Sequence, residues 1–547
     1  MTGSVTEQAS TTTDSRVQER VFAFLTDPAT HPQVHRIDTH AASVFLEDKR
    51  ALKIKRAVRF PYLDYSTLAK RKAACEQEIT INRRFAPQIY RRVIPITEDS
   101  QGSLSIDGEG TPVEFAIEMA RFDESRTIDH LAETGPPASD LIDAIAEAIA
   151  ASHLAAPPVT AGPWIQSIPG ILVGNTTAFR TATCFPKRDI DELEAASRSA
   201  LSRTCGLLEK RGRAGFARHC HGDLHLANIV LIEDKPVLFD AIEFDPTIAS
   251  TDVLYDLAFP IMDFIRYGRH AAANGLMNRY LSTSPLANLD ALGSLPLFLS
   301  LRAAIRANVM LARLSPACCD EADIRQSARV YFDLALRLIR PAAPMMIAIG
   351  GLSGTGKSVL ARALAPYVNP NPGAVVLRSD VLRKQLLHVN ENDRLPESAY
   401  RPEITRQIYE VLGQHATRIL SQGHSVAVDA VFADQTERTA IRNDASKLDV
   451  RFVGLYLQAD LATRQRRVGT RGRDASDATP EIAALQEKYH IGAVDWTLID
   501  ASGAPDQTLK QCQSAIALYP AFSHPSSSGE QKVRTSRQTN RDDREPA

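Results

Sequence analysis

Hydrophobic and polar positions follow two successive patterns along the 547 residues of this chain. Short apolar runs of strand length come first, at 43–46 and 50–55, and a helical stretch follows over about 66–85. After residue 140 the sequence is rich in Ala and Leu, and its pattern is mostly helical. Strands first and helices later predict an α+β domain with a small β-rich lobe and a larger helical lobe.

The second pattern begins after the proline-containing stretch 341–344, which ends the preceding helix. From there apolar strands alternate with helices. Strands are predicted at 345–350, 374–378, 425–429 and 451–457, and helices at 357–366, 403–421, 436–447 and 460–467. This alternation favours an α/β doubly wound fold with a parallel sheet.

These patterns predict two domains, in keeping with a chain too long for one core. The first domain spans 17–340 and the second spans 345–522, with a linker at 341–344. The ends at 1–16 and 523–547 are polar, lack apolar periodicity and are expected to be disordered.

Composition is that of an ordinary globular protein, with 44% hydrophobic and 23% charged residues. The formal net charge of −2 gives no general attraction to nucleic acid or to a membrane surface. The seven cysteines form no CxxC pair, which favours reduced thiols and a cytoplasmic location. We find no apolar run near the roughly 18 residues of a membrane-spanning helix and no apolar targeting segment at the N-terminus.

Phosphate-transfer chemistry is first indicated by the run from His221 to Asn228, which reads His-Gly-Asp-Leu-His-Leu-Ala-Asn. Phosphoryl transfer needs a carboxylate near the acceptor hydroxyl and ligands for Mg²⁺ on the phosphates. We expect Asp223 to orient or deprotonate the acceptor, and Asn228 and Asp240 to bind the metal. Strands at 230–232 and 237–239 would form a hairpin that places Asp240 at a strand end, facing this loop.

Such a site also needs a strand lysine for the α/β-phosphates of ATP and a helix glutamate to hold that lysine. Lys53 is our prediction for the lysine, although Lys55 lies on the same strand face and stays an alternative. Glu78 is our prediction for the glutamate, because it shares a helix face with apolar residues and Glu76 does not. For both the lysine and the glutamate, the alternative interpretation is an exposed surface charge.

These residues resemble the His-Gly-Asp-x-His-x-x-Asn motif of the aminoglycoside phosphotransferase and choline kinase group. The resemblance covers roughly 20–335 and includes Asp252 and the run Tyr255-Asp256-Leu257-Ala258. It implies a protein-kinase-like (aminoglycoside phosphotransferase) fold and the use of ATP and Mg²⁺. Three arginines on one probable helix could bind an anionic acceptor or form surface ion pairs: Arg302, Arg306 and Arg313.

A second signature is a Walker A loop from Gly351 to Ser358, which follows an apolar strand and opens a helix. Its glycines let backbone N–H groups wrap phosphates, and the helix N-terminus adds favourable charge. Lys357 is expected to reach the β/γ-phosphates and Ser358 to bind Mg²⁺. The other ATP-binding positions predicted in this loop are Gly351, Ser353, Gly354, Thr355 and Gly356.

Metal and acceptor groups for this second site are predicted at neighbouring strand ends. Asp429 ends the strand 425–429 and is the candidate metal ligand. Asp380 follows the strand 374–378 and is the candidate acceptor-activating carboxylate, with a helix N-cap as the alternative. Arg383 is a candidate clamp for substrate or phosphate. Arginines also crowd 464–473, where Arg467 and Arg471 are predicted to bind ATP; a solvated basic face is the alternative.

Residues 345–520 resemble the P-loop group that holds gluconate kinase, chloramphenicol phosphotransferase, zeta toxins and polynucleotide kinase. The Ser-Asp-x-x-Arg element at 379–383 is similar to the hydroxyl-phosphorylating members. The whole chain resembles a bacterial two-domain family described as bifunctional aminoglycoside phosphotransferase/ATP-binding protein. That resemblance implies two active sites, each transferring a γ-phosphoryl group to a hydroxyl of a small molecule; a fold does not fix the acceptor.

Two other functions stay open. The P-loop domain could sense nucleotide and regulate a single kinase domain, or the chain could be a stress- or toxin-like kinase that acts on a macromolecule. The low net charge argues against nucleic acid as the partner. The sequence does not determine the oligomeric state.

Overall fold

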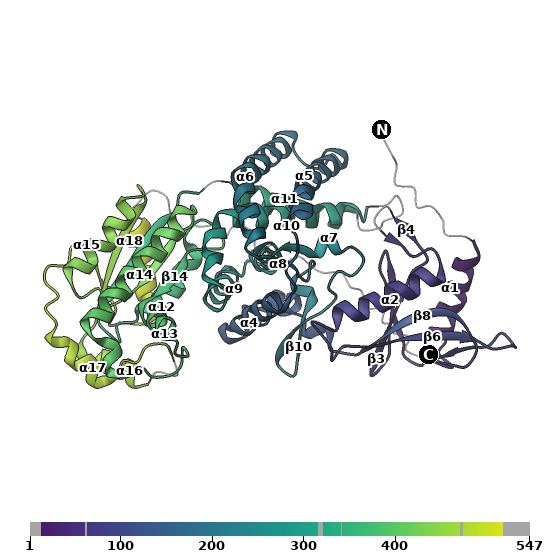
Figure 1. Ribbon diagram of the computed structural model, residues 1–547, viewed down its shortest axis with the longest axis horizontal. Helices are drawn as coiled ribbons and strands as arrows, with labels where there is room; N and C mark the ends of the chain where they lie inside the picture. Colours follow the sequence, from purple (N-terminus) through teal and green to yellow (C-terminus); the bar gives the residue numbers. More distant parts are fainter. Residues whose placement is uncertain (1–11, 61–62, 315–320, 341, 471–473, 518–547) are drawn as a thin grey trace, which may run out of the picture.

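The computed structural model describes residues 12–60, 63–314, 321–340, 342–470 and 474–517. A β-rich lobe, a helical lobe and a second α/β domain follow one another along the long axis of the molecule (Figure 1). The order of these parts in space is their order in the sequence. Both predicted fold classes are confirmed.

The β lobe is built on a six-stranded antiparallel sheet in the order β1-β2-β3-β8-β6-β7. The bounds of these strands are His35–Asp38 (β1), Ala42–Leu46 (β2), Arg50–Lys55 (β3), Tyr90–Glu98 (β6), Leu104–Ile106 (β7) and Thr111–Ala120 (β8). A small hairpin, β4 (Arg59–Phe60) with β5 (Leu63–Asp64), leads into helix α2 (Leu68–Asn82). The strands predicted at 43–46 and 50–55 and the helix at 66–85 are therefore confirmed.

The two faces of this sheet are covered by different helices. Helix α1 (Thr12–Leu25) packs Val21 and Leu25 against Leu52 and Ile54 of β3. Helix α2 packs against the other face, which carries Ala51 of β3. Because side chains alternate along a strand, Lys53 and Lys55 share the α2 face with Ala51.

The prediction of disorder is wrong for residues 12–16, which form the start of α1. Polar composition misled here because these residues precede the apolar face of α1 and because polar side chains of α1 contact distant segments; Asp14, for example, lies 3.3 Å from Arg71 of α2. The side chain of Gln18 is buried, and it donates to the Lys55 carbonyl oxygen (2.6 Å) and to Glu114 (2.9 Å). Residues 1–11 and the predicted tail 523–547 lie outside the described residues.

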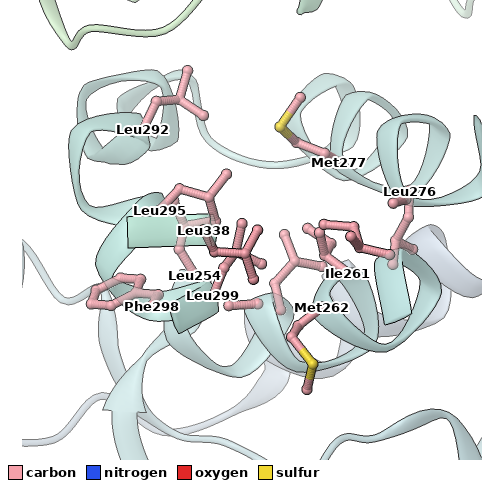
Figure 2. Close-up of a cluster of buried hydrophobic side chains, with 14 of the residues drawn as sticks. Leu254, Ile261, Met262, Leu276, Met277, Leu292, Leu295, Phe298, Leu299 and Leu338 are labelled. Atoms are coloured by element: carbon pink, nitrogen blue, oxygen red, sulfur yellow. The ribbon is translucent and has the colours of Figure 1, made fainter. Parts of the chain in front are cut away.

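The helical lobe surrounds one central helix, α8 (Val253–Arg266), which is buried from Val253 to Ile265. Its other long helices are α3 (Ile128–Thr134), α4 (Ser139–Ala155), α5 (Gly162–Ala182), α6 (Lys187–Arg213), α9 (His270–Thr283), α10 (Leu295–Leu311) and α11 (Glu321–Ile339). Figure 2 shows side chains from α8, α9 and α10 meeting in one apolar cluster, with Leu338 of α11 beside them. Leu224 and Leu226 belong to the same core, which therefore supports the loop from His221 to Asn228.

Two short strand pairs frame that loop. β9 (Ala217–His219) pairs with β12 (Ser250–Asp252), and β10 (Ile229–Ile232) pairs with β11 (Lys235–Leu238). A single helical turn, α7 (Pro246–Ala249), precedes β12. The predicted hairpin is confirmed, and Asp240 lies two residues after the end of its second strand.

The second domain is a five-stranded parallel sheet in the order β14-β15-β13-β16-β17. Its strands are β13 (Met345–Gly351), β14 (Val375–Arg378), β15 (Val426–Asp429), β16 (Arg451–Gln458) and β17 (Thr497–Asp500). Its helices are α12 (Lys357–Leu364), α13 (Ser379–Leu386), α14 (Pro402–Ser421), α15 (Gln435–Ser446), α16 (Leu461–Gly469), α17 (Pro480–Leu485) and α18 (Pro505–Ala517). Helices α12 and α18 pack on one face of the sheet and α14 and α15 on the other, which confirms the doubly wound prediction.

The two domains touch at the exposed edge of this sheet. Strand β14 is the edge strand, and helix α9 of the helical lobe lies beside it. Asn278 accepts from the Val376 backbone N–H (2.7 Å) and donates to the Ala374 carbonyl oxygen (3.2 Å). An ion pair between Arg279 and Glu391 (2.8 Å) adds to this contact. A polar helix side chain thus caps the backbone groups of an edge strand, a position that would otherwise invite pairing with another chain.

Among the described residues, one helical stretch has the length and apolar character of a membrane span. It runs from Leu286 to Leu311 with a mean hydropathy of 1.2, and 67% of its apolar window is buried inside the protein. Core helices of folded domains pass the same test.

Candidate functional site

The first candidate site is built on the loop between β9 and β10, whose backbone is fixed by the central helix. Asp256 of α8 accepts hydrogen bonds from the backbone N–H groups of Gly222 (2.9 Å) and His221 (3.3 Å). Arg302 donates to the Gly222 carbonyl oxygen (3.1 Å). Gly222 has φ +85°, and a Cβ there would lie 3.2 Å from Ala249. The loop conformation therefore depends on a glycine and on two buried charged groups.

The side chains of this loop converge on Asp223. Asn228 donates through its amide nitrogen to the Asp223 backbone oxygen (2.9 Å) and side chain (3.4 Å). His225 lies 3.4 Å from the same carboxylate, whose side chain is 40% exposed. Burial raises the pKa of Asp223, but the neighbouring His225 outweighs it and the pKa lies well below its ordinary value. Asp223 is therefore an open carboxylate, charged at neutral pH and ready to accept a hydrogen bond.

Lys53, Glu78 and Asp240 meet across the two lobes. The Lys53 ammonium lies 2.8 Å from Glu78 and 2.7 Å from Asp240. Burial opposes charge on Lys53, but the carboxylates of Asp240 and Glu78 raise its pKa well above its usual range. Glu76, by contrast, is exposed and pairs with Lys72 on the helix surface. The structure thus brings together the three residues predicted for this part of the site.

Lys55 is separated from Lys53 by its depth and its partners. Its side chain is only 4% exposed, and its ammonium contacts the second oxygen of Glu78 and lies 2.5 Å from Glu243. Lys53 is the lysine beside Asp240, so its position suits a phosphate ligand better than that of Lys55.

Contacts at the end of β11 link the Asp240 segment to the catalytic loop. The Phe239 backbone N–H donates to the Asn228 carbonyl oxygen (3.0 Å), and the His221 ring lies 2.9 Å from the Phe239 carbonyl oxygen. Asp240 itself has φ +61° and donates its backbone N–H to the Tyr90 hydroxyl (3.1 Å). The metal candidates Asn228 and Asp240 therefore belong to one hydrogen-bonded unit.

The three arginines predicted on one helix have different surroundings: Arg302 and Arg306 belong to α10, and Arg313 follows its end. Arg302 is buried against the loop backbone, so a surface role and direct acceptor binding are both wrong for it. Arg313 is exposed. Arg306 is half-buried; burial opposes its charge, but Tyr331, Asp263 and Asp223 raise its pKa above the ordinary value. Asp263 and Tyr331 carried no sequence signal beyond their apolar helical context.

The second candidate site is the loop between β13 and α12. Ser358 donates to Asp429 (2.6 Å), so the two predicted metal ligands lie together at the carboxyl end of the sheet. Gly354 has φ +86°, and a Cβ there would lie 2.5 Å from the Arg464 carbonyl oxygen. The close approach of α16 explains why this position needs glycine. Lys357 donates to the Leu352 carbonyl oxygen across the loop (3.2 Å).

Asp380 and Arg383, the two residues predicted to act on the acceptor, both lie in α13, which follows strand β14. Asp380 lies in the first turn of α13, two residues after the strand end at which Arg378 pairs in register with Asp429. Arg383 is buried and donates to the Ala399 carbonyl oxygen (2.7 Å), with its guanidinium 4.8 Å from the Tyr400 ring. These contacts tie Arg383 to the segment before α14.

The predicted ATP-binding arginine Arg467 has its hydrogen-bond partners away from the P-loop. Arg467 donates to the carbonyl oxygens of Gly503 (2.7 Å) and Ser502 (3.4 Å), beyond β17. Arg471 lies outside the described residues. Arg464 belongs to the predicted arginine-rich stretch 464–473, but it is fully buried and its backbone lies against the loop at Gly354. Sequence reasoning gave no role to Arg378, which bridges Asp429 (3.3 Å) and Asp474 (2.9 Å).

A cavity of about 340 Å³ opens beside the loop. Its walls include Leu352 and Thr355 of the loop, Arg464 of α16, and Asp500 and Ser502 after β17. It is therefore an extension of the second site.

The strand–loop–helix geometry of the second site agrees with a comparison of the sequence with protein-family models, in which a model described as "AAA domain" matches residues 346–490. Residues 346–490 carry an AAA domain. The AAA domain holds both Ser358 and Asp429 and ends before β17.

Curated relatives match nearly the whole chain. The uncharacterized protein Rv2004c of Mycobacterium tuberculosis is 26% identical over 496 residues, which cover 87% of this chain and 93% of that protein. The uncharacterized protein Mb2027c of Mycobacterium bovis matches with the same values. The two-domain arrangement is thus shared along its length with proteins of unassigned activity.

Solved structures resemble each domain separately. A gluconokinase from Sinorhizobium meliloti 1021 covers 33% of this chain and 94% of its own, at 18% identity and a TM-score of 0.24. An amicoumacin kinase solved with AMP-PNP, Ca²⁺ and Ami covers 59% of this chain and 93% of its own, at 13% identity and a TM-score of 0.36. These scores are low, and the fold assignment comes instead from the topology: a two-lobed kinase-like domain followed by the AAA domain with its P-loop.

Proposed function

We propose that this chain is an Mg²⁺- and ATP-dependent phosphotransferase with two nucleotide sites, each transferring a γ-phosphoryl group to a hydroxyl of a small molecule in the cytoplasm. The observation that carries the proposal is the meeting of Lys53, Glu78 and Asp240 across the two lobes. These groups lie beside a catalytic loop whose Asp223 is charged and open. Transfer of this kind depends mostly on positioning and on neutralising phosphate charge.

The donor chemistry of the first site fits Mg²⁺, which prefers oxygen ligands. Asn228 uses its amide nitrogen for Asp223, so its amide oxygen is the atom that can bind a cation beside the Asp240 carboxylate. A bound Mg²⁺ would neutralise the phosphates. Lys53 would hold the α/β-phosphates with Glu78 behind it, and Asp223 would orient or accept the proton of the acceptor hydroxyl.

In the second site the loop from Gly351 to Ser358 would wrap the phosphates, and Ser358 with Asp429 would hold Mg²⁺. Lys357 would neutralise the β/γ-phosphates. Asp380 would face the acceptor hydroxyl. Direct roles for Arg383, Arg467 and Arg471 require these side chains to turn toward the ligands when the ligands bind.

The test is a metabolite screen with the full chain, ATP and Mg²⁺, read by mass spectrometry as addition of one phosphate. Products of the first site should disappear with Asp223→Ala and persist with Asp380→Ala, and products of the second site should show the reverse. Asp234→Ala is the matched control, because Asp234 is exposed in the β10–β11 turn and pairs only on the surface with Arg126. A wild-type protein that binds ATP but modifies no small molecule would contradict the proposal, and labelling of the macromolecular fraction would point to a macromolecular acceptor.

A second candidate function is regulation of the first site by nucleotide bound at the second. The contacts of Arg383 and Arg467 with backbone carbonyl oxygens favour it, because neither side chain is directed to the P-loop. Lys357→Ala separates the two functions: in a regulatory domain it leaves transfer at the first site and removes only its dependence on a second nucleotide.

A further inference from the structure

A second lysine of β3 lies in a ladder of alternating charges that joins the two lobes of the first domain. The ladder runs through Asp240, Lys53, Glu78, Lys55 and Glu243. Glu78 is fully buried, and Lys55 and Glu243 are nearly so, with side chains 4% and 8% exposed. Buried charges of this kind persist only where each has a partner.

The ladder holds a segment, 240–243, that is also bound at its backbone to the β lobe. Asn82 of α2 accepts from the Ala241 N–H (2.7 Å) and donates to the Ala241 carbonyl oxygen (3.2 Å). Gln77 donates to the Glu243 carbonyl oxygen (2.7 Å). The segment begins in the helical lobe at β11, so these bonds and the ladder connect the lobes at the metal candidate Asp240.

The two ends of the ladder are not equivalent once ligands bind. Lys53 and Asp240 are the proposed phosphate and metal ligands, so their mutual contact is available for exchange. Lys55 and Glu243 lie deeper, and Tyr65 covers them with its ring 5.3 Å from the Lys55 ammonium. Their ion pair is the one that persists between β3 and the segment.

We propose that the Lys55–Glu243 ion pair is a latch that positions Asp240 for the metal ion, with Lys55 acting through the segment and not on the phosphates. The latch rests on the proposed function of the first site. Without Lys55, the buried carboxylates of Glu78 and Glu243 would repel each other, and the segment would shift. Outer partners that orient metal ligands typically contribute about 10- to 100-fold in metal affinity.

The test uses the full chain carrying Lys357→Ala, so that AMP-PNP binding reports the first site alone. Lys55→Met, Glu243→Gln and the double variant are titrated by calorimetry with AMP-PNP, with and without Mg²⁺. Each single variant should raise the Mg²⁺ concentration for half-maximal binding by about tenfold, with metal-free affinity changed less than about twofold. The double variant should lose less than the sum of the two, because both single variants break the same Lys55–Glu243 ion pair.

A second readout needs no ligand. Hydrogen exchange of the Asp240 and Ala241 amides, which are bonded to Tyr90 and Asn82, should become at least about tenfold faster in both single variants. Lys72→Met is the matched control, since Lys72 is exposed on α2 and contacts Glu76 on the surface. It should leave both readouts unchanged.

Two outcomes would overturn the latch. The latch is refuted if the single variants keep the wild-type Mg²⁺ dependence of AMP-PNP binding and the wild-type exchange rates of the Asp240 and Ala241 amides. It is also refuted if AMP-PNP affinity falls equally with and without Mg²⁺. If Lys55→Met fails to fold, Glu243→Gln, which keeps the side-chain shape, decides alone. A parent protein that shows no Mg²⁺-dependent AMP-PNP binding refutes the proposed function itself, which distinguishes that failure from failure of the latch.

Discussion

Replacing Asp256 with Asn should separate nucleotide binding from catalysis at the first site. Asp256 is fully buried and accepts from Gly222, His221 and the His153 ring (3.2 Å), with the Arg302 guanidinium 3.6 Å away. An amide has only one acceptor oxygen, so a backbone N–H of the catalytic loop loses its partner, at a cost of about 1–3 kcal/mol. Removal of the carboxylate that pairs with buried Arg302 adds the cost of a broken buried ion pair, about 3–5 kcal/mol.

These two contributions share one site and do not add fully, so we expect the first domain to lose about 4 kcal/mol of its unfolding free energy. AMP-PNP binding should change less than about threefold, because Lys53 and Glu78 lie on the other lobe. ATP turnover at the first site should fall about 100-fold, the effect of a misplacement of Asp223 by roughly 1 Å. Thermal unfolding measures the change in stability, calorimetry measures AMP-PNP affinity, and a steady-state assay measures ATP turnover. Every protein in the comparison also carries Lys357→Ala.

The matched control is Asp333→Asn, on the exposed side of α11, where Asp333 pairs with Arg329. It should change the unfolding free energy by less than about 0.5 kcal/mol. If Asp256→Asn unfolds within about 1 kcal/mol of the parent and turns over ATP at the parent rate, the reasoning that buried Asp256 holds the loop is refuted.

Three further predictions follow from other parts of the structure. Gly354→Ala should reduce the calorimetric stoichiometry of AMP-PNP from two sites to one, because its Cβ would lie 2.5 Å from the Arg464 carbonyl oxygen; a retained second site would contradict this. Burial lowers the pKa of His225, but Asp223 outweighs it and raises the pKa above the ordinary value. The His225–Asp223 pair therefore makes its full contribution to stability at pH values below about 6.5, the pKa of histidine in the unfolded chain. This contribution is lost as the pH rises through the raised pKa of the folded state. The excess stability of wild type over His225→Ala in urea should therefore be smaller at about pH 9 than at about pH 6, and an increase would be the contrary result. Asn278→Ala should weaken the domain contact by about 1 kcal/mol, seen as a wider gap between two calorimetric unfolding transitions; an unchanged gap would show that the edge bonds do not couple the domains.

Local patterns in the sequence were sufficient to predict the helices and strands and the candidate site residues that lie within short motifs. The hairpin 229–238 and the P-loop context follow from apolar runs and glycines, and the structure places Asp240 and Ser358 at the ends that these predict. The fold class followed from the order of strands and helices. These features depend on neighbours within about a dozen residues.

What sequence reasoning missed depends on contacts between distant segments. Helix α1 begins in a polar stretch, yet Gln18 and its partners lie 37 to 96 residues apart in sequence. The choice between Lys53 and Lys55 is settled only by which carboxylate each meets, since both lie on one strand face. Arg464 lies in the arginine-rich stretch 464–473, but its burial under the P-loop becomes visible only when α16 packs there.

The two sites also differ in how far their side chains are already arranged. In the first site, Asp223 already contacts Asn228, and Lys53 already contacts Glu78 and Asp240. In the second site Ser358 and Asp429 are paired, but Arg383 and Arg467 are bound to carbonyl oxygens elsewhere in the domain. A side chain that must first leave a hydrogen bond adds a cost to binding, so closure of the second site must be driven by its ligands. On the proposed function, ligands at the first site displace the contact between Lys53 and Asp240, whereas ligands at the second site must redirect Arg383 and Arg467 from other parts of the domain. Asp380, the acceptor candidate of the second site, follows strand β14. Because Asn278 of α9 is bonded to the edge of β14, the helical lobe holds the strand that positions Asp380.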